Sequence, residues 1–334
     1  MEKTKARVTL RTASVILCFL AAVPGMGAPA TDLTIGDMIF SVSESRTAQV
    51  FHVVDQLSQW DKYAHRQYSR WAAKNLKLDQ EDRQLLEKHA ELRRARGWGN
   101  GFEQAFLVDD PIEVAAAKAI QTNLLSQNEG EAEKEILLHF APKLFSMIED
   151  GAVPIRSFRS RLLAQAHKIG PLLQKLHHFA EVRGPVKVLV FLVANPEEGS
   201  GGGEANAGRL VIEVQTNPDP LTFLFHEAMH VLLNRHLPEI RNAAERVGLN
   251  WQVLNEGIAY ALSPGLTDTS NESDLLSEEL VRDLLQGKTA SDSYTQFYIV
   301  GNVIRPVLRS SLKRGETITQ FLPKAVSKWQ KIAK

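Results

Sequence analysis

The segment Arg209–His236 has the sequence RLVIEVQTNPDPLTFLFHEAMHVLLNRH. In its first seven residues the apolar side chains of Leu210, Ile212 and Val214 alternate with their neighbours, which predicts a strand. Asp219-Pro220 then supplies a good N-cap residue and a proline suited to the first helical position. We therefore expect a strand followed directly by a helix, with bulky apolar residues that bury the helix in a core.

Upstream of this segment, the short apolar run Val186–Val193 has no helical period and predicts a buried strand. The glycine-rich segment Glu197–Gly208 separates it from the strand Arg209–Gln215, and we interpret it as a flexible hairpin connection. It lacks the Lys-Ser/Thr ending of a phosphate-binding loop. Residues 43 to 182 carry apolar and aromatic residues at helical spacing. The sequence thus predicts an α+β, mostly helical fold, with a helical N-terminal domain over residues 31–183 and a second domain over residues 184–334.

The N-terminus has the features of a cleavable secretory signal. Four basic residues between positions 3 and 11 precede an apolar run, Ala13–Val23, which is followed by Ala28-Pro29-Ala30. This run is about half the ~20 residues that a membrane-spanning helix needs. We expect residues 1–30 to be a signal peptide, cleaved near Ala30, and the mature protein to be periplasmic or secreted, with no stable membrane span.

Composition narrows the possible chemistry. The single cysteine, Cys18, lies inside the predicted signal peptide, so any metal site of the mature chain must use histidine and carboxylate ligands. The formal net charge is zero, which gives no electrostatic indication of a nucleic-acid partner. We interpret the histidines of the helical half as core or surface residues; they are His52, His65, His89, His139, His167, His177 and His178.

The predicted helix after Asp219 contains His226, Glu227 and His230 in the arrangement H-E-x-x-H. Residues four apart lie on the same helix face, so the two imidazoles can share one zinc ion. Glu227 lies about 100° round the helix from His226. It can therefore reach a water molecule at the metal without being a ligand itself. The spacing separates metal binding from proton transfer.

A catalytic zinc site needs a third protein ligand and an open fourth position. Glu256 lies 26 residues after His230, in the segment Asn255–Tyr260, on a helix that Asn250 can cap. It is a single carboxylate on an otherwise apolar helix, and a bound cation would remove the cost of burying it. The alternative interpretation is that Glu256 is a solvated surface acid.

The combination of HEAMH with NEGIAYAL resembles the gluzincin clan of metallopeptidases, which includes thermolysin-like enzymes and zinc aminopeptidases. The resemblance covers roughly residues 186 to 312. It implies a zincin-like C-terminal metallopeptidase domain, with one zinc ion held by His226, His230 and Glu256 and with Glu227 as general base. It also implies a small β-sheet next to the helix that carries HExxH.

The resemblance implies further parts of the site. A tyrosine stabilises the developing oxyanion in many clan members, and Tyr294 is the nearest match here, with Tyr298 as the second choice. Tyr260 stands where thermolysin-like enzymes carry an acid that orients a zinc-binding histidine. The strand Arg209–Gln215 occupies the place of the cleft-edge strand that pairs with an extended substrate. Glu213 on this strand is a candidate to meet a substrate amine.

We therefore expect a zinc-dependent peptidase, secreted or periplasmic, that acts on a peptide or protein substrate. A zinc ion there would acidify water and polarise the scissile carbonyl, and Glu227 would accept the proton. One alternative is a zinc-containing, non-catalytic binding or scaffold protein of the cell envelope. Another is a helical structural protein with a fortuitous HExxH. The sequence leaves the substrate, exo- or endopeptidase action and the oligomeric state open.

Overall fold

The computed structural model of the chain describes residues 30–197, 199, 201–206, 208–215, 219–267, 277–286 and 293–333. The predicted signal peptide, residues 1–30, lies outside these residues except for Ala30. Among the helices that the structure describes, none is long and apolar enough to cross a membrane.

The described strands form one five-stranded sheet in the order β1-β2-β3-β5-β4. β1 and β2 form an antiparallel hairpin, whereas β2, β3 and β5 run parallel to one another. β4 is antiparallel to β5 and lies at the edge of the sheet. The strand bounds are β1 Thr31–Ile35, β2 Met38–Ser43, β3 Val186–Ala194, β4 Gly203–Asn206 and β5 Arg209–Val214.

The sheet corrects two expectations. The predicted hairpin between the strands Val186–Val193 and Arg209–Gln215 is wrong, because β3 and β5 are parallel neighbours. The glycine-rich segment instead contributes β4, whose four residues (GEAN) carry no β-branched or aromatic side chain that would have predicted a strand. The expectation that strand Arg209–Gln215 forms the cleft edge is also wrong: β5 is paired on both sides, and β4 is the edge strand that contacts α9.

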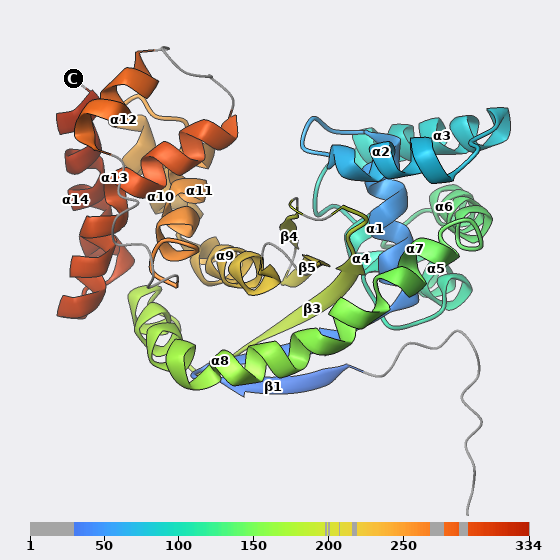
Figure 1. Cartoon of the computed structure of the whole chain (residues 1–334), viewed down its shortest axis with the longest axis horizontal. Coiled ribbons are helices and arrows are strands. Elements are labelled where there is room, and N and C mark those ends of the chain that lie inside the picture. Colours follow the sequence, from blue (N-terminus) through green and yellow to red (C-terminus); the bar gives the residue numbers. More distant parts are fainter. Residues whose placement is uncertain are drawn as a thin grey trace, which may run out of the picture.

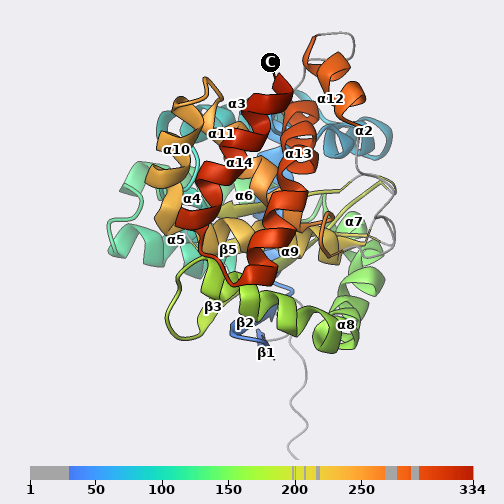
Figure 2. The same cartoon turned by 90° about the vertical axis from the view of Figure 1, so that its left-hand side faces the viewer.

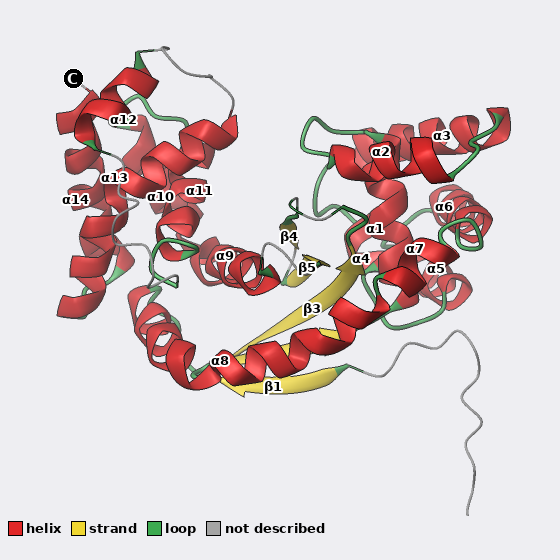
Figure 3. Cartoon of the chain, viewed as in Figure 1, coloured by secondary structure: helices red, strands yellow, loops and turns green. Residues whose placement is uncertain are grey.

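Helices surround the sheet in two groups (Figures 1 and 3). The first group, α1 to α7, lies beyond the end of β3 in Figure 1, and the second, α10 to α14, lies on the far side of α9. The bounds of the first group and of the long helix that follows it are α1 Arg46–Ser58, α2 Arg66–Asn75, α3 Gln80–Arg96, α4 Phe102–Phe106, α5 Ile112–Gln121, α6 Gln127–Phe140, α7 Phe145–Asp150 and α8 Ala152–Phe179. The remaining bounds are α9 Pro220–Leu233, the 3-10 turn Asn234–His236, α10 Leu237–Glu245, α11 Trp251–Leu262, α12 Glu278–Leu285, α13 Ser293–Arg314 and α14 Ile318–Ala333.

The α+β, mostly helical fold is confirmed. β1 and β2, however, come from the segment that the sequence assigned to a helical N-terminal domain, and β2 pairs with β3 of the second segment. The two parts of the chain therefore share one sheet. In Figure 2 the strands β1 and β2 lie beside α8 near the bottom of the view, and α9 lies above them.

Alternate residues of β5 enter two different hydrophobic cores. Leu210, Ile212 and Val214 pack in a core with residues of α8, α9, α11 and α13. Val211 packs in a second core with residues of α1 and α4 to α7. Successive side chains of a strand point to opposite faces of the sheet, so the sheet divides the molecule into these two cores. Side chains on one face of β4 and β5 therefore point toward α9, and those on the other face point toward α1.

A buried ionic network joins four of the helices that contribute to the second core. Asp55 of α1 accepts hydrogen bonds from His89 Nε2 at 2.9 Å and Arg93 Nε at 2.6 Å. Glu133 of α6 faces His89 Nδ1 at 2.9 Å, and Glu103 of α4 accepts from Arg93 Nη2 at 2.6 Å. All five side chains are buried. Buried charges are tolerated when each one is paired, so this network fixes how α1, α3, α4 and α6 pack together.

The network makes stability depend on pH. Burial alone would lower the pKa of His89, but Glu133 and Asp55 outweigh it and raise the pKa to about 9. An unfolded histidine has a pKa of about 6.5. The protonated His89 therefore stabilises the fold fully below pH ~6.5, and this contribution disappears as the pH rises through about 9.

We expect the thermal unfolding midpoint to fall by several degrees between pH 6.5 and 9.5. In His89→Gln the midpoint should be lower at pH 6.5 and its decline with pH less steep, with the remaining slope coming from groups such as His52. Differential scanning fluorimetry across this range measures both. His167→Gln, at an exposed position on α8, is the control and should keep the wild-type slope. An unchanged slope in His89→Gln would contradict the assignment.

Candidate metal centre

Helix α9 begins as the sequence predicted. The Asp219 side chain accepts a hydrogen bond from the Leu221 backbone N–H at 3.1 Å, and Pro220 occupies the first turn. Both features stabilise a helix start, where backbone N–H groups lack partners within the helix. Leu224, Phe225 and other apolar side chains of α9 are buried in the first core. His226 and His230 therefore project from a helix whose start and orientation are fixed.

Helix α11 carries the third candidate ligand. Asn250 caps it, and its side chain accepts from the Gln252 N–H at 2.8 Å. α11 packs against α13 at a place where two glycines permit close approach: a Cβ on Gly257 would lie 2.5 Å from Val300 Cγ1, and one on Gly301 would lie 2.8 Å from Tyr260 Cβ. This close packing fixes the face of α11 that carries Glu256.

The structure brings the three predicted ligands together. His226 Nε2 and His230 Nε2 are 3.3 Å apart, and Glu256 Oε2 lies 3.2 Å from the first and 3.3 Å from the second. Three ligand atoms at ~2.0–2.1 Å from one zinc ion, at tetrahedral angles, would be ~3.3–3.4 Å apart. The triangle has the dimensions of three corners of such a tetrahedron. These residues can hold one metal ion, and Glu227 is not among them.

The candidate centre is open on one side. The side chains of His226, His230 and Glu256 are 12%, 15% and 30% exposed. The alternative of a solvated Glu256 facing away from the histidines does not hold, since its carboxylate contacts both rings. Burial raises the pKa of Glu256, but the two histidines outweigh it and lower the pKa well below its usual range. A partly exposed cluster leaves room for the fourth, exchangeable position of a catalytic metal.

Asn255 is a further candidate site residue, which the sequence did not single out although it directly precedes Glu256. Its side-chain amide lies 3.0 Å from His230 Nδ1, and its Oδ1 is buried without a hydrogen-bond partner among the described residues. Rotating the amide by 180° lets Oδ1 accept from Nδ1–H, which satisfies both groups. In that arrangement His230 presents the lone pair of Nε2 to the metal, as a ligand must.

The structure shows which groups surround His226, for which the sequence identified no orienting partner. Its Nδ1 faces the backbone oxygen of Ser263 at 3.5 Å, a long hydrogen bond. Tyr260, at the position where an acid was sought, packs edge-on against the His226 ring, with the ring centroids 4.8 Å apart. A backbone carbonyl and an aromatic ring therefore orient His226. Neither could be recognised from residue type alone.

Glu227 is buried beside the metal centre, with 8% of its surface exposed. A Cβ on Gly203 of β4 would lie 2.9 Å from Glu227 Cγ, so the edge strand passes directly over this carboxylate. Burial raises the pKa of Glu227 to about 7; His226 opposes the rise, and Glu256 adds to it. A dication nearby would pull this pKa down. The position suits a group that accepts and releases a proton.

Tyr294, Tyr298 and Glu213 are the remaining candidate residues. The Tyr294 side chain lies outside the described part of the structure, so its role stays a prediction. Tyr298 on α13 is 40% exposed and stays the second choice. The suggestion that Glu213 meets a substrate amine is wrong, because Glu213 is fully buried on β5 and accepts hydrogen bonds from His52, His65 and Gln67.

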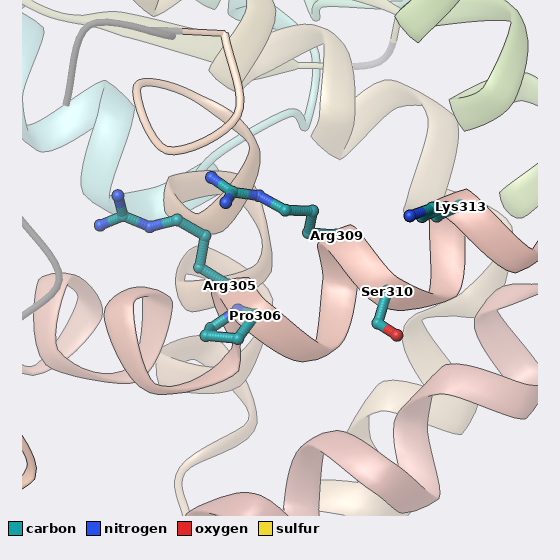
Figure 4. A pocket seen from close by; sticks show the side chains of 5 residues that line it. All are labelled: Arg305, Pro306, Arg309, Ser310 and Lys313. Atoms are coloured by element: carbon teal, nitrogen blue, oxygen red, sulfur yellow. The ribbon is translucent and has the colours of Figure 1, made fainter. Parts of the chain in front are cut away.

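A separate hollow lies on α13 (Figure 4). Its lining contains none of the metal-centre residues and consists of Arg305, Pro306, Arg309, Ser310 and Lys313. In Figure 4 the Arg305 and Arg309 side chains project to the same side of the helix, as expected for residues four apart. This hollow contributes nothing to the metal centre.

We expect Glu256→Ala to lose bound zinc and Asn255→Ala to bind it about 10–100-fold more weakly, because Asn255 orients His230. Competition with a chromogenic chelator measures both affinities. Glu239→Gln on α10, half-exposed and away from the centre, is the control. Wild-type affinity in Asn255→Ala would show that this amide does not fix the ring.

Comparisons with protein-family models, with curated proteins and with solved structures give no match to this chain. The resemblance to gluzincins thus depends on the two motifs and on the way in which the fold brings their side chains together.

Proposed function

We propose that this protein is a zinc-dependent peptidase of the gluzincin type that hydrolyses peptide bonds in a peptide or protein substrate. The observation that carries the proposal is the triangle of two imidazole nitrogens and one carboxylate oxygen, 3.2–3.3 Å on each side. Glu227 lies beside it and outside the ligand set. A structural metal site would have no need of a buried carboxylate next to its open side.

Zinc is the metal that this donor set favours. Two neutral imidazoles and one carboxylate in tetrahedral geometry match catalytic zinc sites, whereas magnesium and calcium prefer six or more oxygen ligands. The mature chain as predicted offers no thiolate, so a cysteine-ligated metal is ruled out for it. When bound, the metal supplies Lewis acidity that polarises a carbonyl and acidifies water.

The chain's own residues supply the other parts of the proposed reaction. Glu227 accepts a proton from the attacking water and passes it to the leaving amine. β4 offers an edge of the sheet next to Glu227, to which an extended peptide can pair. Tyr294 or Tyr298 of α13 donates a hydrogen bond to the developing oxyanion. We place the protein in the periplasm or outside the cell, on the strength of the predicted signal peptide.

We expect Glu227→Gln to retain one zinc per chain while its turnover falls by about 10²–10⁴-fold, because the amide cannot accept the proton. Elemental analysis of the purified protein gives the metal content, and a fluorogenic peptide library gives the activity. Glu239→Gln is the matched control and should equal wild type in both measurements. Wild-type turnover in Glu227→Gln would refute the role of Glu227. Bound zinc without cleavage by wild type would favour the non-catalytic binding protein.

A further inference from the structure

The proposed substrate site has residues on both faces of β4. Glu227 lies on one face, and His65 lies on the other. A Cβ on Gly203 would press on Glu227, whereas one on Gly202 would collide with the ring of His65. Consecutive residues of an extended chain point to opposite faces. β4 therefore separates Glu227 from His65, and Figure 1 shows it between α9 and the group of helices that includes α1. His65 comes from the α1–α2 connection, far from HExxH in the sequence.

His65 is held in place from beneath. Its Nδ1 donates to Glu213 Oε1 at 2.7 Å, and its backbone N–H donates to Gln56 Oε1 at 2.6 Å. Glu213 is fully buried and also accepts from His52 Nε2 at 3.0 Å and Gln67 Nε2 at 3.1 Å. The ring is thus supported by a carboxylate that is itself fixed by two further side chains. A hydrogen-bonded support of this kind positions a side chain for binding.

The other nitrogen of this ring is available. His65 is 24% exposed, and Nε2 makes no hydrogen bond to any residue that the structure describes. Burial alone would lower the pKa of His65, but the charge of Glu213 outweighs it and raises the pKa. The ring is therefore protonated over a wider pH range than a free histidine. A partly exposed imidazolium N–H binds carboxylates strongly.

Glu204 and His52, which lie on the same face as His65, form an ion pair with each other. Glu204 of β4 lies 3.5 Å from His52 Nδ1, and His52 also faces Glu213. Burial lowers the pKa of His52, but Glu204 and Glu213 outweigh it and raise the pKa to about 10, so His52 is a cation between two carboxylates. The cluster as a whole is balanced: two histidines face two carboxylates. The edge of His65 that carries Nε2 is the cationic part left for a ligand.

We propose that His65 is a substrate-binding residue whose Nε2–H donates to a carboxylate of a peptide paired with β4, on the opposite face of that strand from Glu227. The inference rests on the proposed peptidase function and adds a substrate class to it: peptides that carry a carboxylate within one or two residues of the scissile bond. The carboxylate is an acidic side chain or a free C-terminus, since both present the same acceptor. The bound strand alternates, so one residue faces the metal and its neighbour faces His65.

Binding to zinc-loaded Glu227→Gln protein tests this without turnover. Fluorescence anisotropy is measured with a neutral peptide in which glutamate replaces glutamine at each position in turn, with the C-terminus free or amidated. We expect the peptide with glutamate at one particular position, or the peptide with a free C-terminus, to bind about tenfold more tightly than its neutral counterpart. One charge-assisted hydrogen bond would give an increase of this size. A gain in affinity at one glutamate position would identify a side-chain carboxylate as the group that His65 binds. A loss of affinity on amidation would identify the C-terminal carboxylate instead.

The variants Glu227→Gln/His65→Gln and Glu227→Gln/His65→Lys complete the test. The glutamine can keep the bond to Glu213 but has no charge, so the preference for carboxylate should disappear. The lysine restores a cation and should restore part of the preference. Glu227→Gln/His167→Gln, with its change on exposed α8, should behave as the parent. A preference that survives His65→Gln, or glutamate and glutamine peptides that bind equally to Glu227→Gln, would overturn the proposal.

The two proposals fail separately. If wild type cleaves no peptide but the carboxylate preference depends on His65, hydrolysis is wrong and the binding role of His65 holds. If wild type cleaves peptides with no regard to nearby carboxylates, the peptidase proposal holds and that for His65 falls. Should His65→Gln not fold, the glutamate–glutamine comparison on Glu227→Gln and the lysine variant still decide.

Discussion

The candidate site depends on the cost of pointing three electron-rich atoms at one another. Two imidazole nitrogens and a carboxylate oxygen lie 3.2–3.3 Å apart, and their lone pairs repel unless protons or a cation lie between them. A fold that holds them there keeps the arrangement only with protons or a cation between the three atoms. α9, α11 and the glycine-mediated contact of α11 with α13 hold the three atoms in place. With its amide turned so that Oδ1 faces the ring, Asn255 would give His230 the tautomer that a metal ligand needs.

The sheet organises everything around that triangle. β5 sends alternate side chains into two cores. Because β4 is paired with β5, its side chains also alternate between the face that carries α9 and the face that carries α1. Glycines at 202 and 203 let the backbone of the edge strand lie against His65 on one face and Glu227 on the other, where any Cβ would collide. The same geometry turns a helical half with no recognisable motif into one wall of the proposed substrate site. Its buried ionic networks hold that wall rigid, since a buried charge cannot leave its partner without cost.

Much of the metal centre could be predicted because it is local. The spacing of His226 and His230 on one helix fixes their common face. Asp219 and Asn250 predict where the two helices begin, because their side chains can cap a helix N-terminus. The errors arose where pairing between distant segments decides. β4 has no strand composition, and its position at the edge follows from the order of strands, which includes β1 and β2 from the start of the chain. The sequence favours a core or surface role for His65 and places Glu213 on an edge strand, because nothing local links positions 148 residues apart.

The amino-acid sequence is enough to predict the fold class, the helix that carries HExxH and the residue types available to a metal. These features depend on periodicity, on capping residues and on the absence of thiols in the predicted mature chain. Only the folded chain shows that Glu256 contacts both histidines, that β4 is the edge strand next to α9, and that His65 lies across this strand from Glu227. Contacts between segments far apart in the sequence are set by how apolar faces pack and how strands order themselves. Those are collective properties of the whole chain, and no single motif encodes them.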